Sequence, residues 1–347
     1  MKKIKTIFFF ILLQMAASIS CKSQTAMQTK DDFSKGADIG WLAQMEATGY
    51  KFYDADGSEK DCLLLLKERG INTVRLRVWV DPSDDKISGH CSPEETAVMA
   101  LRAQKMGMRI MINFHYSDTW ADPGKQKKPA AWDSHSFAEL LNDVYRHTYD
   151  VLILLKKRGV NPEWVQIGNE IPSGMLWPEG STDHWSQLAQ LLNKGYDATK
   201  AVDKKIKVIV HVDQGNNNKR FRAFFDNAVA NNTKYDVIGL SYYPYWIKED
   251  YKNNISDLEN NLNDMSKRYN KEVMVVEVGG EDTLVENTRD MLTAVIKAVK
   301  KVPENKGLGV IYWEPQGAKI WSGYSLSAWQ QDGRPSPALD AFKNNKL

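Results

Sequence analysis

The sequence predicts an α/β protein folded as a single (β/α)8 barrel, the TIM barrel. Eight short apolar runs rich in β-branched and aromatic residues recur along the chain, and stretches with helical periodicity separate them. The alternation fits into about 300 residues, which is the length that eight βα units need. No glycine-rich phosphate loop follows a predicted strand. A closed barrel therefore explains the pattern better than an open doubly wound sheet.

Each predicted element follows from its local pattern. The predicted strands are Gly36–Trp41, Thr73–Trp79, Arg109–Tyr116, Trp164–Glu170, Lys207–Val212, Val237–Pro244, Val273–Val278 and Gly309–Glu314. The predicted helices are Lys60–Arg69, Glu94–Met106, Phe137–Arg158, His184–Val202, Phe221–Ala230, Ile255–Tyr269 and Leu284–Lys301. Gly70, Gly107 and Gly159 each stand between a helical stretch and the next strand, which is where a helix C-terminus uses glycine.

The first 20 residues have the features of an export signal. Lysines at positions 2, 3 and 5 precede an apolar run from Ile7 to Ala17, and small residues precede Cys21. Residues 1–20 are therefore predicted to be a signal peptide of the lipoprotein type, with Cys21 lipidated. An ordinary signal cut nearby is the alternative. Residues 21–35 are expected to form a tether and residues 36–347 the barrel, so we expect an exported protein anchored by lipid at the cell surface or in the periplasm.

Composition narrows the class of partner. Lys and Arg total 46 and Asp and Glu total 44, a net charge of +2 that would not steer the protein toward nucleic acid or an anionic membrane. Eleven tryptophans offer flat apolar faces on which sugar rings can stack, although core packing also uses them. We expect a neutral polysaccharide as partner, contact with a membrane only through the lipid anchor, and a monomer.

Two cysteines remain once Cys21 is assigned to the anchor. Cys62 falls in an apolar helical stretch and Cys91 in a loop. Two cysteines alone cannot complete a tetrahedral zinc site. They can form a disulfide in an oxidising compartment, and the sequence leaves open whether they do.

Two glutamates end apolar strands. The active site of a (β/α)8 barrel gathers at the C-terminal ends of its strands, and Glu170 and Glu277 close the predicted fourth and seventh strands. Two carboxylates across a barrel mouth suit glycoside hydrolysis, in which one protonates the departing oxygen and the other supports an oxocarbenium-like transition state. A separation on the order of 5 Å would make the second a nucleophile and give retention of configuration. The alternative is a pair of structural ion pairs at strand ends.

The strand-end motifs resemble the family 53 endo-β-1,4-galactanases, within the large clan of retaining (β/α)8 glycosidases. The most distinctive match is the segment His115-Tyr-Ser-Asp-Thr-Trp-Ala-Asp-Pro-Gly-Lys-Gln126 after strand three. Further matches are Lys35–Asp38, Arg75–Trp79, Asn169-Glu170, Ser241–Pro244, Glu277 and Tyr312–Pro315. The resemblance covers roughly residues 35 to 340. It implies endo-hydrolysis of β-1,4-galactan or type I arabinogalactan with retention, Glu170 as acid/base and Glu277 as nucleophile.

The polar neighbours of these glutamates have roles that their chemistry suggests. Asn169 can donate its amide to the 2-hydroxyl of the sugar. Arg77 offers a rigid fork of donors suited to keeping Glu277 ionised, and Arg75 lies one layer deeper on the same side of its strand. A structural salt bridge in the barrel is the alternative for either arginine.

Further substrate-binding residues are expected at the ends of strands and in the loops. His115 and Tyr243 end strands and carry hydrogen-bonding groups, although His115 also fits a satisfied core histidine. Trp313 is expected to form the floor of the subsite for the sugar that is cleaved, and Trp120 to stack on a further sugar. Trp177, Trp246 and Trp321 are weaker candidates for stacking.

We expect no cofactor and no metal. Some family members carry calcium on a late loop, but this chain has no D-x-D-x-D run there and places Lys319 nearby. Two alternative functions remain: a retaining endo-glycosidase acting on mannan, xylan or glucan, and a non-catalytic glycan-binding lipoprotein at the cell surface.

Overall fold

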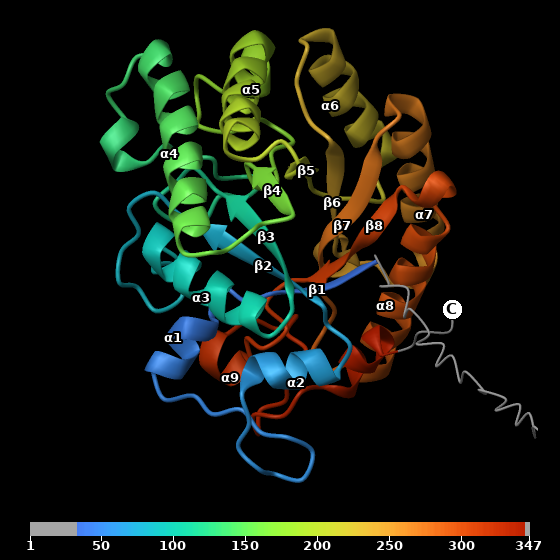
Figure 1. Cartoon of the computed structure of the whole chain (residues 1–347). Helices are drawn as coiled ribbons and strands as arrows, with labels where there is room; N and C mark the ends of the chain where they lie inside the picture. The colour runs from blue at the N-terminus through green and yellow to red at the C-terminus, as the bar shows by residue number, and fades with distance from the viewer. Residues whose placement is uncertain (1–32, 344–347) are drawn as a thin grey trace, which may run out of the picture. The chain divides into compact units, whose positions relative to one another are not determined.

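The computed structural model describes residues 33–343, and these residues form a closed (β/α)8 barrel. Eight parallel strands follow one another around the barrel in chain order, and β8 closes it by pairing with β1 (Figure 1). The strands are β1 Ser34–Asp38, β2 Thr73–Val78, β3 Arg109–Phe114, β4 Trp164–Ile167, β5 Lys207–Val212, β6 Val237–Tyr242, β7 Glu272–Val278 and β8 Gly307–Tyr312. The predicted fold class is confirmed.

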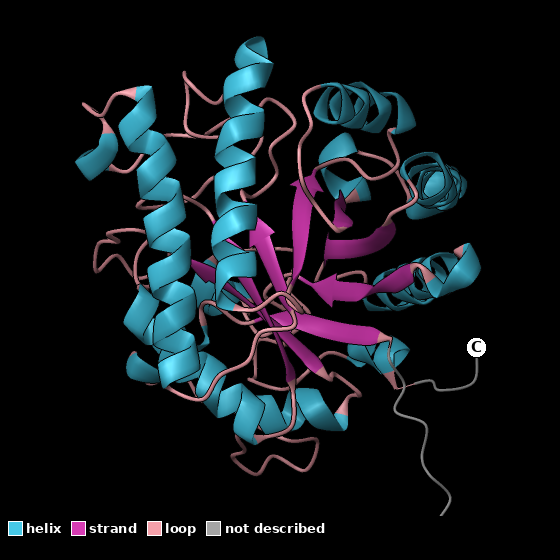
Figure 2. Ribbon diagram, turned by 45° about the horizontal axis from the view of Figure 1, so that its top comes forward, coloured by secondary structure: helices cyan, strands magenta, loops and turns pink. Residues whose placement is uncertain are grey.

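Helices surround the strands on the outside (Figure 2). They are α1 Leu42–Ala47, α2 Cys62–Glu68, α3 Pro93–Lys105, α4 Phe137–Lys157, α5 Trp185–Val202, α6 Asn218–Ala230, α7 Tyr251–Tyr269, α8 Val285–Lys300 and the short α9 Lys319–Ser322. Ser92 and Ser136 start α3 and α4 with capping boxes, because each serine accepts from the backbone of a glutamate three residues later that bonds back. None of the helices in the described part of the chain is long and apolar enough to cross a membrane.

The N-terminal boundary differs from the predicted one. Ser34 and Lys35, which the sequence analysis places in the tether, pair with Gly309 and Val310 of β8. Lys35 is buried, and its ammonium group donates to the carbonyl of Phe342. The predicted signal peptide, the lipidation at Cys21 and nearly all of the tether lie outside the described residues.

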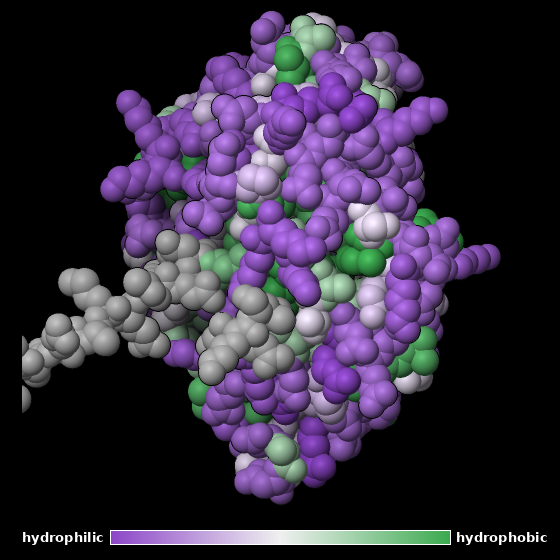
Figure 3. Space-filling model, turned by 90° about the vertical axis from the view of Figure 1, so that its right-hand side faces the viewer, coloured by the Kyte–Doolittle hydropathy of each residue, from purple (hydrophilic) through white to green (hydrophobic). Residues whose placement is uncertain are grey.

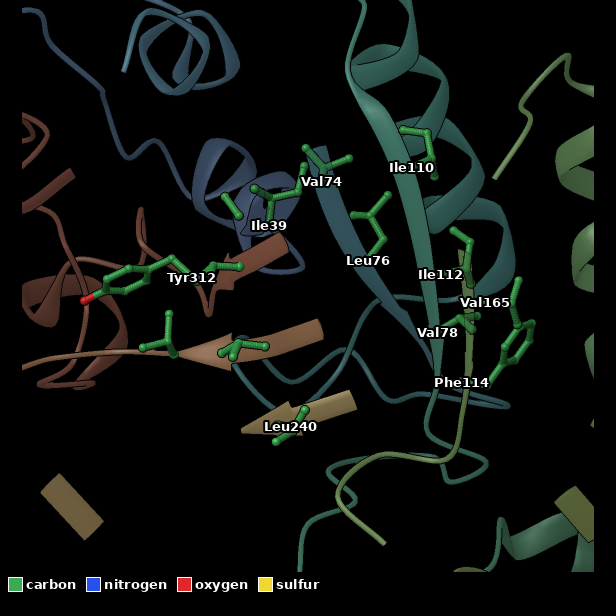
Figure 4. Packing of buried hydrophobic residues seen from close by; sticks show 14 of the residues in the cluster. Ile39, Val74, Leu76, Val78, Ile110, Ile112, Phe114, Val165, Leu240 and Tyr312 are labelled. Carbon is green, nitrogen blue, oxygen red and sulfur yellow. The ribbon is translucent and has the colours of Figure 1, made fainter. Parts of the chain in front are cut away.

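The apolar core has two parts. Outward-facing side chains of the strands, including Val74, Leu76 and Ile112, belong to the large cluster that packs against the helices (Figure 4). A smaller cluster fills the inside of the barrel: Met111, Trp164, Ile209, Val237, Met274, Val276 and Ile311. Nearer the C-terminal ends of the strands the interior becomes polar, with Arg75, Gln166 and His211 all completely buried. The apolar layer therefore supports a polar layer at the barrel mouth.

Cys62 and Cys91 are both buried free thiols. The Cys91 thiol donates to the carbonyl of Gly40 at 3.3 Å. The disulfide that the sequence left open is not formed.

On the face shown in Figure 3, hydrophilic side chains predominate and apolar ones are scattered among them.

Candidate active site

A cleft with two lobes opens at the C-terminal ends of the strands. The larger one, the Glu277 lobe, has a volume of about 850 Å³ and is lined by Asp122, Pro123, Glu170, Tyr243, Trp246, Glu277, Trp313 and Tyr324. The smaller one, the Asp213 lobe, has about 430 Å³ and is lined by Glu170, Asp213, Gln214, Asn216, Ser241, Tyr243, Trp246 and Ile247. Glu170, Tyr243 and Trp246 line both, so the lobes meet at Glu170.

Glu170 lies three residues beyond the end of β4, which ends at Ile167, rather than within the strand. The chain leaves the sheet through Gly168, whose φ is 79°, and Glu170 itself has a φ of 44°. A positive φ is unfavourable for a glutamate, and such strain is typical of functional sites. The Glu170 backbone N–H donates to Nδ1 of His211 at 3.3 Å, and the Ser241 hydroxyl donates to the Glu170 carboxylate at 2.5 Å. These two bonds hold the strained residue with its carboxylate in the cleft.

His211 completes a short hydrogen-bonded chain behind Glu170. Because Nδ1 of His211 accepts from the Glu170 backbone, its proton lies on Nε2, which donates to the Ser241 oxygen at 2.7 Å. The pKa of His211 is held well below its ordinary value, mainly by burial and then by the charge of Arg75. His211 therefore stays neutral and orients the hydroxyl that bonds Glu170.

Glu277 reaches the cleft with the help of an irregularity in β7. The register between β6 and β7 shifts after Leu240, which pairs with Val275, so that Ser241 pairs with Glu277 and Val276 is skipped. A bulge of this kind changes the direction of the following side chain and is common beside active sites. Arg75 forms an ion pair with the Glu277 carboxylate at 2.9 Å, and the Tyr243 hydroxyl donates to it at 3.3 Å.

The two carboxyl groups have different electrostatic surroundings. Burial raises the pKa of both glutamates. For Glu170 the negative charge of Glu277 adds to this, and within residues 33–343 no cation forms an ion pair with it, so its pKa lies well above the ordinary range. For Glu277 the adjacent Arg75 opposes the effect of burial. Glu277 therefore ionises at a lower pH than Glu170.

The arginine beside Glu277 is Arg75, not Arg77 as predicted. Arg75 is completely buried and also bonds Asp38, Gln166 and Asn169. Arg77 instead pairs with the buried Glu314 at the end of β8, and its Nη1 lies 3.9 Å from Asp38. Both side chains point into the barrel, as the alternation requires, but they meet different carboxylates. The structural salt bridge, left open in the sequence analysis, applies to Arg77.

Asn169 and His115 lie close to the reaction centre but are engaged with the protein. The Asn169 oxygen accepts from Arg75 and Asn113, and its amide nitrogen donates to the carbonyl of Ala121 at 2.9 Å. Nδ1 of His115 accepts from the backbone N–H of Ala121 at 3.2 Å. Burial, together with the charges of Arg75 and then Arg77, holds the pKa of His115 well below its ordinary value. Both residues anchor the loop after β3 at the cleft.

Of the aromatic residues that the sequence predicted to bind sugar, some line the cleft, whereas another packs behind the residues that line it. Trp313 lines the Glu277 lobe, as does Trp246, which was a weaker candidate. Trp120 lies behind this wall, with its ring 5.8 Å from that of Trp313 and the Arg77 guanidinium 4.5 Å from its centroid. Trp120 is not among the residues that line either lobe in the described structure. Its position indicates support of Trp313.

Some residues at the barrel mouth could not be assigned from the sequence, or were not. Glu314 closes the predicted eighth strand, so the same reasoning that found Glu170 and Glu277 also applies to it, but in the structure it is fully buried against Arg77 and lines neither lobe. Pro123 and Tyr324 line the Glu277 lobe. They come from loops, where no periodic signal marks them. No group of three or more His, Cys, Asp or Glu side chains in residues 33–343 is arranged to hold a metal ion.

The sequence is similar to those of known glycoside hydrolases, in agreement with a cleft that contains two carboxyl groups. Residues 34–342 match Glycosyl hydrolase family 53. An uncharacterized protein of Niallia circulans is 36% identical, with 92% of each chain covered. An arabinogalactan endo-beta-1,4-galactanase of Thermothelomyces thermophilus is 30% identical over 89% of this chain and 98% of its own.

A solved structure gives the same result for the fold and the family. The GH53 catalytic domain of Ignisphaera aggregans superposes with a TM-score of 0.83 at 32% identity, covering 90% of this chain and 96% of that one. The match extends over nearly the whole barrel. The chain therefore belongs to glycosyl hydrolase family 53 and is a glycoside hydrolase.

Proposed function

We propose that this enzyme hydrolyses internal β-1,4-galactosidic bonds of galactan and type I arabinogalactan with retention of configuration. One observation carries the assignment of roles: Glu170 and Glu277 line the same cleft, and among the described residues a cation is paired with Glu277 but none with Glu170. A retained proton suits Glu170 as general acid/base, and a carboxylate oriented by Arg75 and Tyr243 suits Glu277 as nucleophile. The names of the curated relatives support galactan as the polymer.

The geometry suggests how the reaction proceeds. Glu277 attacks the anomeric carbon while Glu170 protonates the departing oxygen, and a glycosyl ester forms on Glu277. Glu170, now ionised, then removes a proton from water, which attacks the same carbon and releases the sugar. Trp313 and Tyr324 wall the lobe around Glu277 with aromatic surface, which suits a sugar ring at that position.

The first test measures reducing-sugar release from linear β-1,4-galactan, with mannan, xylan and cellulose in parallel. Wild type should release short oligosaccharides from galactan only. Glu170→Gln should lower kcat about 10²- to 10⁴-fold, and Glu277→Gln should abolish turnover. Glu281→Gln is the matched control, because Glu281 lines a different cavity. Activity on another polymer instead of galactan would overturn the substrate, and full activity of either cleft variant would overturn the roles.

Stereochemistry is tested separately. Proton NMR of the first products from galactan should show the β-anomer, which then mutarotates. A first product with the α-configuration would exclude a covalent intermediate on Glu277 and would require inversion.

We also propose that the protein is exported and anchored through a lipid on Cys21. The lysines at the N-terminus, the apolar run and the small residues before Cys21 support this. Mass spectrometry of the mature protein should find a diacylglycerol-modified cysteine at its N-terminus. An unmodified N-terminus at another residue would contradict the proposal.

A further inference from the structure

Charged side chains are distributed unevenly over the barrel, although the net charge of the whole chain is only +2. In a (β/α)8 barrel each helix runs back along its strand, so the helices end, and the next strands begin, at the end of the barrel opposite the cleft. Unpaired basic side chains gather at this end, beside the last turns of α3 and α4 and in the loop between α5 and β5.

Six exposed cations from these three segments form a surface that we call the basic patch: Lys105, Lys156, Lys157, Arg158, Lys204 and Lys205. Hydrogen bonds join the segments. Gln104 donates its side-chain amide to the carbonyl of Gly159 at 2.7 Å, and its side-chain oxygen accepts from the N–H of Asn161 at 2.8 Å. The helices α4 and α5 lie side by side (Figure 1), and the Lys156 ammonium group donates to the carbonyl of Val202 at the end of α5 at 3.3 Å. The six cations therefore lie on one continuous surface.

The patch has an excess of positive charge. Within residues 33–343, none of its six cations forms an ion pair with a carboxylate. The same segments contain two acidic residues. Glu163 is paired with Arg109, and Asp203 accepts from the backbone N–H of Lys205 at 2.8 Å. Six positive charges thus stand against one carboxylate that lacks an ion-pair partner, that of Asp203.

The helix dipole explains only part of this concentration. Lys105, Lys156 and Lys157 lie in the last turns of α3 and α4, where the dipole favours cations. Lys204 and Lys205 lie beyond α5, which ends at Val202, and the effect of the dipole is confined to the last turn. Like charges so close together repel one another, and an anionic partner would relieve that repulsion.

The same end of the barrel receives the chain from its N-terminal side. The strand β1 begins at Ser34, and the Asn72 side chain donates to the carbonyl of Phe33 at 3.0 Å. Residues 22–32 separate Phe33 from Cys21 and span at most about 40 Å even when fully extended. A bilayer that holds a lipid on Cys21 is therefore within reach of this end of the barrel, whereas the cleft opens at the other end.

Anionic phospholipid headgroups are the partner that this surface fits. A bilayer that contains them attracts Lys and Arg side chains within about one Debye length, which is about 10 Å at an ionic strength of about 0.1 M. Each basic side chain that reaches such a surface strengthens binding about fivefold. A soluble polyanion would meet the same charges, but the position of the patch at the end where the chain enters the barrel favours the membrane.

We propose that the basic patch docks the barrel on the anionic bilayer that holds its lipid, so that the cleft faces away from the membrane. This inference rests on the proposed lipid anchor and extends it, because the barrel itself then contacts the membrane. None of the six cations lines either lobe of the cleft, so hydrolysis in solution does not depend on them.

The test measures how fast individual lysines are acetylated on vesicles. The mature protein, purified from cells that export it, is bound to vesicles of phosphatidylcholine alone or of phosphatidylcholine and phosphatidylglycerol in equal parts. Mass spectrometry after treatment with N-hydroxysuccinimidyl acetate should show Lys105, Lys157 and Lys205 modified at least about fivefold more slowly on the anionic vesicles. Salt at about 1 M should abolish the difference, because it shortens the Debye length to about 3 Å. Lys127 and Lys248, exposed in the loops after β3 and β6, are internal controls and should react equally on both.

A variant of the patch tests whether its charge causes the protection. Lys157→Gln, Lys204→Gln and Lys205→Gln together remove half of the positive charge of the patch. The remaining Lys105 and Lys156 should then be acetylated at nearly equal rates on the two kinds of vesicle. The matched control combines Lys127→Gln with Lys248→Gln and Lys252→Gln, exposed positions outside the patch, and should keep the protection. Both variants should unfold in urea at the midpoint of wild type, which shows that the fold is intact.

The outcomes separate the docking surface from the lipid anchor. Equal acetylation of the patch on the two kinds of vesicle would overturn the docking, and so would protection by soluble polyglutamate without protection by anionic vesicles. Protein that washes off neutral vesicles but is protected on anionic ones would contradict the lipid and support the docking. Protein that stays on both without protection of the patch would support the lipid and overturn the docking.

Discussion

Replacing Arg75 by methionine should move the acid limb of the pH profile. Arg75 lies 2.9 Å from the Glu277 carboxylate, and both groups are buried. Unit charges about 4 Å apart interact by about 4 kcal/mol at an effective dielectric constant of about 20. At about 1.36 kcal/mol per pKa unit, this interaction lowers the pKa of Glu277 by at most about three units. Water that enters the vacated space recovers part of this energy, so we expect the pKa of Glu277 to rise by about one to three units.

The sign follows from the role of Glu277. A nucleophile must be ionised, so kcat/KM falls as the pH drops through its pKa, and a raised pKa brings that loss to higher pH. The assay is kcat/KM on galactobiosyl fluoride as a function of pH. The matched control is Arg77→Met, which also removes a buried arginine, but one that is paired with Glu314. Its acid limb should stay near that of wild type.

Stability must be measured beside activity, because removal of one partner from a buried ion pair costs about 3–5 kcal/mol. Arg75→Met leaves Asp38 and Glu277 without their shared partner, so urea unfolding should show a loss of that size. If the variant does not fold, Arg75→Lys keeps the charge but not the fork of donors, and it should give a smaller shift in the same direction. A shifted acid limb in Arg77→Met together with an unshifted one in Arg75→Met would refute the reasoning and restore Arg77 as the partner of Glu277.

Three further predictions concern the pKa of Glu170 and the stability of the barrel. Glu277→Gln should lower the pKa of Glu170, because the charge of Glu277 raises it; carboxyl ¹³C NMR titration of the folded variant measures this, and an unchanged or higher pKa would contradict it. Ser241→Ala should raise the pKa of Glu170, because the hydroxyl stabilises its carboxylate; Glu170 then keeps its proton to higher pH, so the basic limb of kcat/KM should move up, and a downward shift would count against the assignment. Leu292→Ala, at a fully buried position of α8, should lower the free energy of unfolding by about 2–5 kcal/mol in urea titration without a change in the pH profile; a loss below about 1 kcal/mol would mean that the site repacks.

Local patterns were sufficient for the fold and for the two glutamates. Strands of a closed parallel barrel are short apolar runs, and each must be followed by a helix that covers it, so the alternation is visible residue by residue. Glu170 and Glu277 were identifiable because a carboxylate directly after such a run is conspicuous and because the strand ends of a barrel meet at one place. Both inferences can be made without information on which side chains are in contact.

Contacts between side chains of different strands could not be predicted from the sequence pattern. Arg75 and Arg77 were correctly placed on one face of β2, but which carboxylate each one meets depends on the stagger of the barrel and on how β7 and β8 align with it. The bulge that skips Val276 shifts β7 by one residue and brings Glu277 opposite Ser241. A period-two pattern cannot predict an extra residue.

The sequence by itself determined the barrel, the position of its mouth and the two carboxyl groups there, because these depend on alternation along the chain. Tertiary structure decided that Arg75 is the partner of Glu277, that Trp120 supports Trp313, and that Trp246 stands where the two lobes meet. These features depend on packing between segments far apart in the chain and on loops without a periodic pattern, and that information appears only when the barrel closes.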